Sequence, residues 1–292
     1  MRRSAYLSFV ALLGLASQAQ ANVTARMPLG LWLYTVDLTA GNVVPVVELS
    51  EVIPVSGITW TGDGELLAFV AGDRLVAIDP DTGQVSTRAT FDLGTGAPLG
   101  LAADACGRLF LATFESTSEV VIRQLDPGTG SSPVVATLPP GAFGPLAAHG
   151  TSLFMIRRSG GPPAQGTVLR IEPDTGAILE VPTAPLLDWT PRGLDLDPQG
   201  RLWLTWMPPP MSPPQVTTPV HRIDLLTGAV TDFPELPVLE PFAIAPAGGL
   251  CSGGQVPAIP ALSPFGALGL AAGLAAAGAI LLARRHRLAA AP

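Results

Sequence analysis

The chain has 292 residues, of which 32 are glycine and 31 are proline, and its formal net charge is −7. All sixteen basic residues are arginines, and the absence of lysine excludes Schiff-base and lysine-base chemistry. Between residues 22 and 257, eleven arginines accompany all 23 acidic residues, so this segment carries a charge of −12. An acidic segment without a basic patch argues against nucleic acid and anionic lipid headgroups as partners.

The N-terminus has the pattern of a secretory signal peptide. Two arginines precede an apolar run over residues 6–16, and an Ala-Gln-Ala cleavage site follows at residues 19–21. We therefore predict that residues 1–21 are a signal peptide, which signal peptidase removes by cutting between Ala21 and Asn22.

Two repeated units organise the middle of the chain. The first, typified by Ile78-Asp79-Pro80-Asp81-Thr82-Gly83, has an acidic residue that caps a turn, a proline that presets φ and a glycine suited to the left-handed region. Each copy predicts a β-hairpin. The second unit, a strand, a tight turn and a strand, precedes each hairpin, and repeats of four strands are typical of propeller blades. The glycines that end the first unit are Gly41, Gly83, Gly130, Gly176 and Gly228.

The two ends of the repeat region complement each other. Residues 29–49 contain only the hairpin half of a blade, and residues 241–251 contain only the earlier half. Together they would complete a fifth blade, which closes the ring and removes its exposed edges. The sequence therefore predicts an all-β fold, a five-bladed β-propeller over residues 22–251 whose N- and C-terminal strands share one blade. The motifs resemble those of the NHL, virginiamycin-B-lyase-like and YVTN propeller superfamily over residues 28–251, which implies the fold but no particular function.

The C-terminus carries three consecutive elements of a sorting signal. The motif Ile259-Pro260-Ala261-Leu262-Ser263 precedes an apolar span over residues 265–283 and an arginine-rich tail over residues 284–292. As a transmembrane helix the span would be roughly 28 Å long, about one hydrocarbon core, with its basic end in the cytoplasm. This arrangement resembles the IPTL-CTERM sorting domain, and the resemblance implies processing by an exosortase-like enzyme. An ordinary tail anchor is the alternative, and residues 252–264 would link either one to the propeller.

The chain contains only two cysteines, Cys106 and Cys251. Export into an oxidising compartment permits a disulfide between them, whereas two separate buried thiols are the alternative. Neither cysteine has the spacing of a metal site or of a redox motif.

Residues that could support catalysis are few. His149 and His221 are expected to point in different directions, whereas Asp195 and Asp197 alternate on an inner strand and could face the channel together. No nucleophile elbow, metal motif or cofactor motif is present, so we predict no catalytic, metal or cofactor residue and no cofactor. The expected function is an exported protein of binding or structural type, anchored in the inner membrane facing the periplasm and then transferred to the cell surface or released. The alternative is a periplasmic lyase or hydrolase that uses the propeller channel.

Two long loops, residues 157–166 and 207–215, join the second and third strands of neighbouring blades. They are expected to share one face of the ring with the entries to the inner strands, and this face is the candidate surface for an unknown ligand. The alternative is that the loops are insertions without a role, since loops accept insertions at little cost. The candidate binding residues are Arg157, Arg158, Trp189, Arg192 and Glu240.

Overall fold

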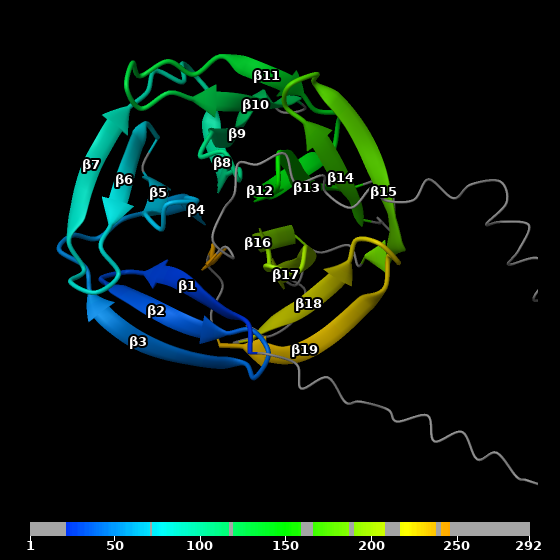
Figure 1. Cartoon of the computed structure of the whole chain (residues 1–292), viewed down its shortest axis with the longest axis horizontal. Helices are drawn as coiled ribbons and strands as arrows, with labels where there is room; N and C mark the ends of the chain where they lie inside the picture. The colour runs from blue at the N-terminus through cyan, green and yellow to red at the C-terminus, as the bar shows by residue number, and fades with distance from the viewer. Residues whose placement is uncertain are drawn as a thin grey trace, which may run out of the picture.

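The computed structural model describes residues 22–70, 72–116, 119–158, 166–186, 190–207, 217–237 and 241–245. Over these residues the chain forms twenty strands in five four-stranded antiparallel sheets, arranged radially around an axis (Figure 1). The predicted five-bladed β-propeller is confirmed. No helix in these ranges has the length and hydropathy needed to cross a membrane. The predicted signal peptide, sorting motif, apolar span and basic tail lie outside the described residues.

We number the blades 1 to 5 in chain order and call the first strand of each blade, the one nearest the axis, its inner strand (Figure 1). Blade 1 contains β20 (Ala243–Ile244), β1 (Thr24–Leu29), β2 (Trp32–Asp37) and β3 (Asn42–Glu48). The strands of blade 2 are β4 (Val55–Trp60), β5 (Leu66–Val70), β6 (Arg74–Ile78) and β7 (Val85–Thr90), and those of blade 3 are β8 (Ala97–Ala103), β9 (Leu109–Ser116), β10 (Glu119–Leu125) and β11 (Val134–Thr137). Blade 4 consists of β12 (Ala142–His149), β13 (Ser152–Arg158), β14 (Gly166–Glu172) and β15 (Ala177–Leu186), and blade 5 of β16 (Thr190–Leu196), β17 (Arg201–Met207), β18 (Thr218–Asp224) and β19 (Val230–Leu236).

Both ends of the chain close blade 1, but they divide its strands differently from the prediction. The sequence predicted two strands from each end, whereas the N-terminal segment supplies three and β20 supplies one. The strand β1 was missed because no turn motif precedes it. The closing strand is short, and it pairs with β1 only through Ala243 and Ile244, opposite Arg26 and Ala25.

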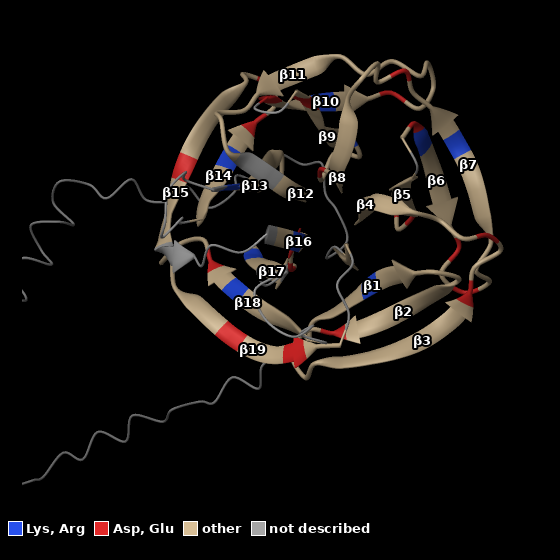
Figure 2. Cartoon of the chain, turned by 180° about the vertical axis from the view of Figure 1, so that it is seen from behind, with Lys and Arg blue, Asp and Glu red and all other residues tan. Residues whose placement is uncertain are grey.

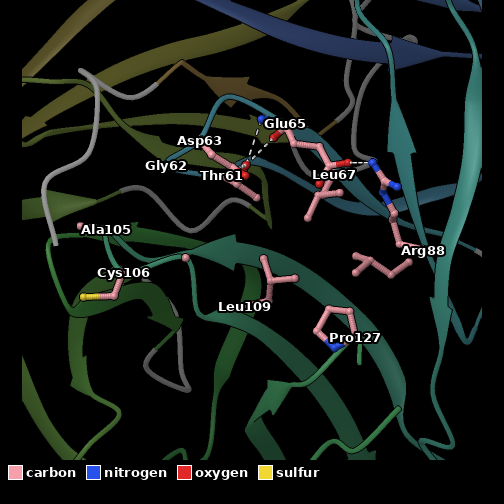
Figure 3. Close-up of a pocket in the computed structure, with 12 residues that line it drawn as sticks. Thr61, Gly62, Asp63, Glu65, Leu67, Arg88, Ala105, Cys106, Leu109 and Pro127 are labelled. Carbon is pink, nitrogen blue, oxygen red and sulfur yellow. Dashed lines mark hydrogen bonds and ion pairs between the residues drawn. The ribbon is translucent and has the colours of Figure 1, made fainter. Parts of the chain in front are cut away.

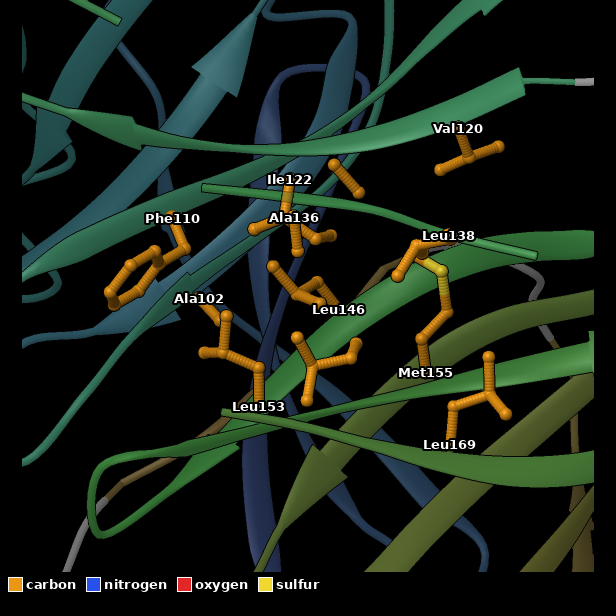
Figure 4. Packing of buried hydrophobic residues seen from close by; sticks show 12 residues of the cluster. Ala102, Phe110, Val120, Ile122, Ala136, Leu138, Leu146, Leu153, Met155 and Leu169 are labelled. Carbon is orange, nitrogen blue, oxygen red and sulfur yellow. The ribbon is translucent and has the colours of Figure 1, made fainter. Parts of the chain in front are cut away.

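The hydrophobic core lies between neighbouring blades rather than within one sheet. Five clusters of buried side chains fill the five interfaces, and each cluster mixes residues of two adjacent blades. Figure 4 shows the cluster between blades 3 and 4, where Phe110 and Ile122 share an interface with Leu153 and Leu169. Because side chains alternate between the two faces of a strand, each blade can contribute to two clusters.

The glycine of the repeated hairpin packs each blade against the outermost strand of the preceding blade. Gly83, for example, has a φ of 73°, and a Cβ atom at this position would clash with the backbone carbonyl of Glu48 on β3. Both the positive φ and this close approach require glycine. The motif therefore has a structural role in assembling the ring. The corresponding neighbours are Pro234 for Gly41, Thr90 for Gly130, Val135 for Gly176 and Pro182 for Gly228.

The inner strands contact one another around the axis. We call the side of the ring that carries the turns after the inner strands the turn face, and the opposite side the loop face. Turns of adjacent blades contact each other on the turn face, where the Ala105 amide donates to the Gly150 carbonyl at 2.8 Å. The strand β20 is antiparallel to β1, as β4 is to β5, so the chain leaves Ile244 on the turn face.

The outermost strand of blade 1 exposes two valine side chains, whereas the described residues of β11 and β15 each include one exposed large apolar side chain, Val134 and Leu179. On β3, Val44 and Val46 are 57% and 43% exposed. Pro45 lies between them, and proline offers no N–H group to a further strand.

Candidate functional site

In a propeller enzyme, acidic and basic side chains on the inner strands would line the channel. The described inner strands of this chain carry few such side chains. Within the five inner strands as described, Asp195 on β16 is the one carboxylate. The residues at the equivalent position of the other inner strands are Thr59, Ala102, Ala147 and Ala243.

Asp195 joins two blades through hydrogen bonds to the backbone. Its Oδ2 accepts from the amide of Ile244 on β20 at 2.6 Å, and its Oδ1 accepts from the amide of Leu196 at 2.8 Å. Thr59 makes the equivalent bond between blades 2 and 3, because its Oγ1 accepts from the amide of Ala103 at 3.1 Å. At both positions the side chain attaches one inner strand to the next, and at Asp195 this holds the short closing strand.

Burial changes the ionisation of Asp195. Loss of solvation raises the pKa of its carboxyl from 3.8 to about 7, although the two backbone donors favour the ionised form. The negative charge of Asp197 raises this pKa further. Asp195 nevertheless keeps a small exposed area. A carboxyl with a pKa near neutrality is the kind of group that acid–base catalysis uses, but both oxygens of Asp195 are occupied by backbone donors.

Asp197 does not share a face with Asp195, which corrects the sequence-based expectation. β16 ends at Leu196, so strand alternation stops there, and Asp197 caps the following turn. The residue is 1% exposed, and its carboxylate accepts from Arg201 Nε at 2.7 Å and from Trp203 Nε1 at 2.9 Å. The hydrogen bonds of the Asp197 carboxylate therefore go to this turn and to the strand that follows it.

The two histidines lie in different blades. His149 ends the inner strand of blade 4, packs beside Gly200, and has a lowered pKa because burial disfavours its charged form. His221 is on β18 of blade 5, where its Nδ1 lies 2.7 Å from Oδ1 of Asp232. Across the described ranges, no group of three His, Cys, Asp or Glu side chains could hold a metal ion. Arginine and acidic residues are spread around the ring (Figure 2).

Two side chains of the predicted binding surface are described. Arg157 on β13 forms an ion pair with Glu180 on β15. Arg192 on β16 is exposed, although it too has an interaction partner. The side chain of Arg158, together with Trp189 and Glu240, lies outside the described residues, so the predicted surface stays a prediction.

A cavity of about 570 Å³ lies between blades 2 and 3 on the turn face (Figure 3). Sequence reasoning did not predict it, because its walls come from three turns and four strands, and those of blade 2 and blade 3 are adjacent only in the folded ring. Its lining residues are Thr61, Gly62, Asp63, Glu65, Leu67, Leu75, Arg88, Ala105, Cys106, Gly107, Leu109 and Pro127.

No protein-family model matches the chain, and no curated protein matches it. The prediction of a sorting domain therefore rests on residues 259–292 alone. Solved structures with a similar fold include TolB from Acinetobacter baumannii, with a TM-score of 0.46 and 18% identity over 72% of this chain and 52% of that one. Putative TolB from Agrobacterium tumefaciens gives 0.48 and 13% identity over 75% and 80% of the two chains. A protein of unknown function from Bacteroides caccae gives 0.40 and 10% identity over 72% of each chain. The chain spans about half the length of the Acinetobacter protein, and these likenesses carry no argument about what it binds or catalyses.

Proposed function

We propose that the chain is an exported five-bladed β-propeller of binding or structural type, carrying a C-terminal signal for an exosortase-like sorting enzyme. We prefer a binding or structural protein to an enzyme because of the hydrogen bonds that Asp195 makes. This carboxyl, the one acid on the described inner strands, bonds to the backbone of the closing strand. Hydrolysis or elimination needs several titratable groups that converge on a substrate, whereas the described inner strands carry this single carboxylate.

The proposal of export and sorting is supported by the two ends of the sequence. Residues 1–21 have the charge, length and cleavage site of a signal peptide, and residues 259–292 combine a short motif, an apolar span and arginines. The mature protein would be held in the inner membrane, facing the periplasm, until the sorting enzyme releases it to the cell surface.

The loop face is the proposed ligand-binding surface. The chain leaves β20 on the turn face and continues toward the apolar span, so a tethered propeller would present its loop face away from the membrane. Arg192 is exposed near the start of the inner strand β16.

The test is fractionation of producing cells with mass spectrometry of the mature C-terminus. The wild-type protein should lose residues 265–292 and leave the inner membrane. A variant with Ile259→Ala and Pro260→Ala should keep its tail and stay in that membrane, while Val256→Ala in the same linker should behave as wild type. Equal processing of all three proteins, or an intact cytosolic chain, would contradict the proposal.

A further inference from the structure

The cavity between blades 2 and 3 has walls suited to an uncharged peptide. Leu67 on β5 and Leu109 on β9 contribute apolar side chains (Figure 3), and Leu75 on β6 contributes a third. The charged groups in the wall already have partners, because Arg88 forms an ion pair with Glu65. A charged ligand would have to displace this pair, whereas a neutral segment would not.

Asp63 is the other acid in the wall, and it is also engaged. Its carboxylate accepts a hydrogen bond from the Thr61 hydroxyl, which lowers its pKa. Each charged side chain that lines the cavity, Asp63, Glu65 and Arg88, therefore has a partner within the protein.

Cys106 lies in the wall of this cavity and is part of a disulfide. It sits in the turn after β8, where its amide donates to Oδ1 of Asp104 at 2.9 Å. The sequence contains one other cysteine, Cys251, which lies outside the described residues.

The path of the chain brings the remaining cysteine within reach. β20 ends at Ile244 on the turn face, the same face as the cavity, and β20 contacts β4, the inner strand of blade 2. Cys251 follows Ile244 by seven residues, which in extended form span about 24 Å. Those residues, Pro-Ala-Gly-Gly-Leu-Cys from position 246 on, are uncharged and small apart from one leucine.

We propose that residues 246–251 occupy the cavity between blades 2 and 3, where Cys251 is joined to Cys106. The two thiols lose two protons and two electrons to a disulfide-bearing oxidant, which is reduced to a dithiol. The closing strand β20 would then be held from both sides. Asp195 binds its amide, and the disulfide fixes the segment that follows it, so that two paired residues suffice to close the ring.

The first experiment maps the disulfide in the full-length protein, purified from producing cells after alkylation of free thiols. A non-reduced digest should contain Cys106 and Cys251 in one cross-linked peptide from the monomer. Cys251→Ser should lower the melting temperature by on the order of 10 °C, whereas Ser252→Ala should not. A disulfide-linked dimer would overturn the proposal and indicate a second copy as the partner. Thiols that stay free both in producing cells and after mild oxidation of the purified protein would also overturn it.

The second experiment tests the position of the segment while keeping both cysteines. Leu250→Glu puts a charge among the apolar wall residues and should raise hydrogen exchange of residues 61–65 and 105–109 at least tenfold, whereas Gln255→Glu should leave it unchanged. Unchanged exchange in both variants would overturn the proposed position. Disulfide formation in the cell rests on the proposed export. If the thiols are free in the cell but the purified protein forms the bond under mild oxidation, the export is wrong and the position of the segment stands.

Discussion

Replacing Asp195 with asparagine should remove a pH-dependent cost to the stability of the propeller. The folded-state pKa is about 7, against 3.8 for an ordinary aspartate. Below pH 3.8 the carboxyl is protonated in both the folded and the unfolded chain. Between these two values the folded protein keeps a proton that the unfolded chain has released, so the stability contributed by this group falls as the pH rises. It is lost once the pH has passed 7, and the difference amounts to about 4 kcal/mol.

Asparagine cannot ionise, and its Oδ1 can still accept from the amide of Ile244. The variant should therefore match the wild type within about 1 kcal/mol at pH 4 and exceed it by about 3 kcal/mol at pH 8. Urea unfolding followed by tryptophan fluorescence from pH 4 to pH 8 measures both curves. Asp126→Asn is the opposite control, since backbone and Thr129 donors lower the pKa of that carboxyl, and its loss should reduce stability at pH 8. Parallel curves for the wild type and Asp195→Asn would refute the reasoning.

Two further predictions concern the ring and the loop face. Gly57→Ala should destabilise the propeller by about 3 kcal/mol or more, because the new Cβ would lie 2.8 Å from the backbone carbonyl carbon of Gly100 in the next blade. Gly62→Ala should cost under about 1 kcal/mol, since the nearest atom to its Cβ would be 3.6 Å away. Thermal melting distinguishes the two variants, and equal melting points would contradict the packing argument. Arg158→Ala together with Arg192→Ala should reduce by at least fivefold the amount of purified protein that sediments with producing cells. Arg88→Ala, which removes an arginine from the turn face, should change it little, and undiminished sedimentation of the double variant would argue against the loop face.

The five blades could be predicted because the residues of each repeat favour a β-hairpin locally. The hairpin glycines need a positive φ and a close neighbouring backbone, and both needs restrict the residue type at five spaced positions. No such turn precedes the strand β1, and its six residues match neither of the two repeated units. Its place in blade 1 is set by pairing with β2 and β20, which is a long-range property.

The candidate site was less predictable for a related reason. Strand alternation placed Asp195 and Asp197 together, but the strand stops between them, and the turn then directs Asp197 toward Arg201 and Trp203. The partner of Asp195 is 49 residues away in sequence. The cavity between blades 2 and 3 likewise depends on which turns become neighbours after ring closure. Spacing along the chain predicts hairpins well, but it does not specify contacts between blades.

The proline in the middle of β3 affects whether copies of the protein associate through their outermost strands. An exposed valine-rich strand at the rim is a surface on which a neighbouring molecule could add its own strand, and repeated addition would produce fibres. Pro45 interrupts the row of donors that such growth requires. Many propellers could therefore be packed at high concentration and still diffuse as separate particles.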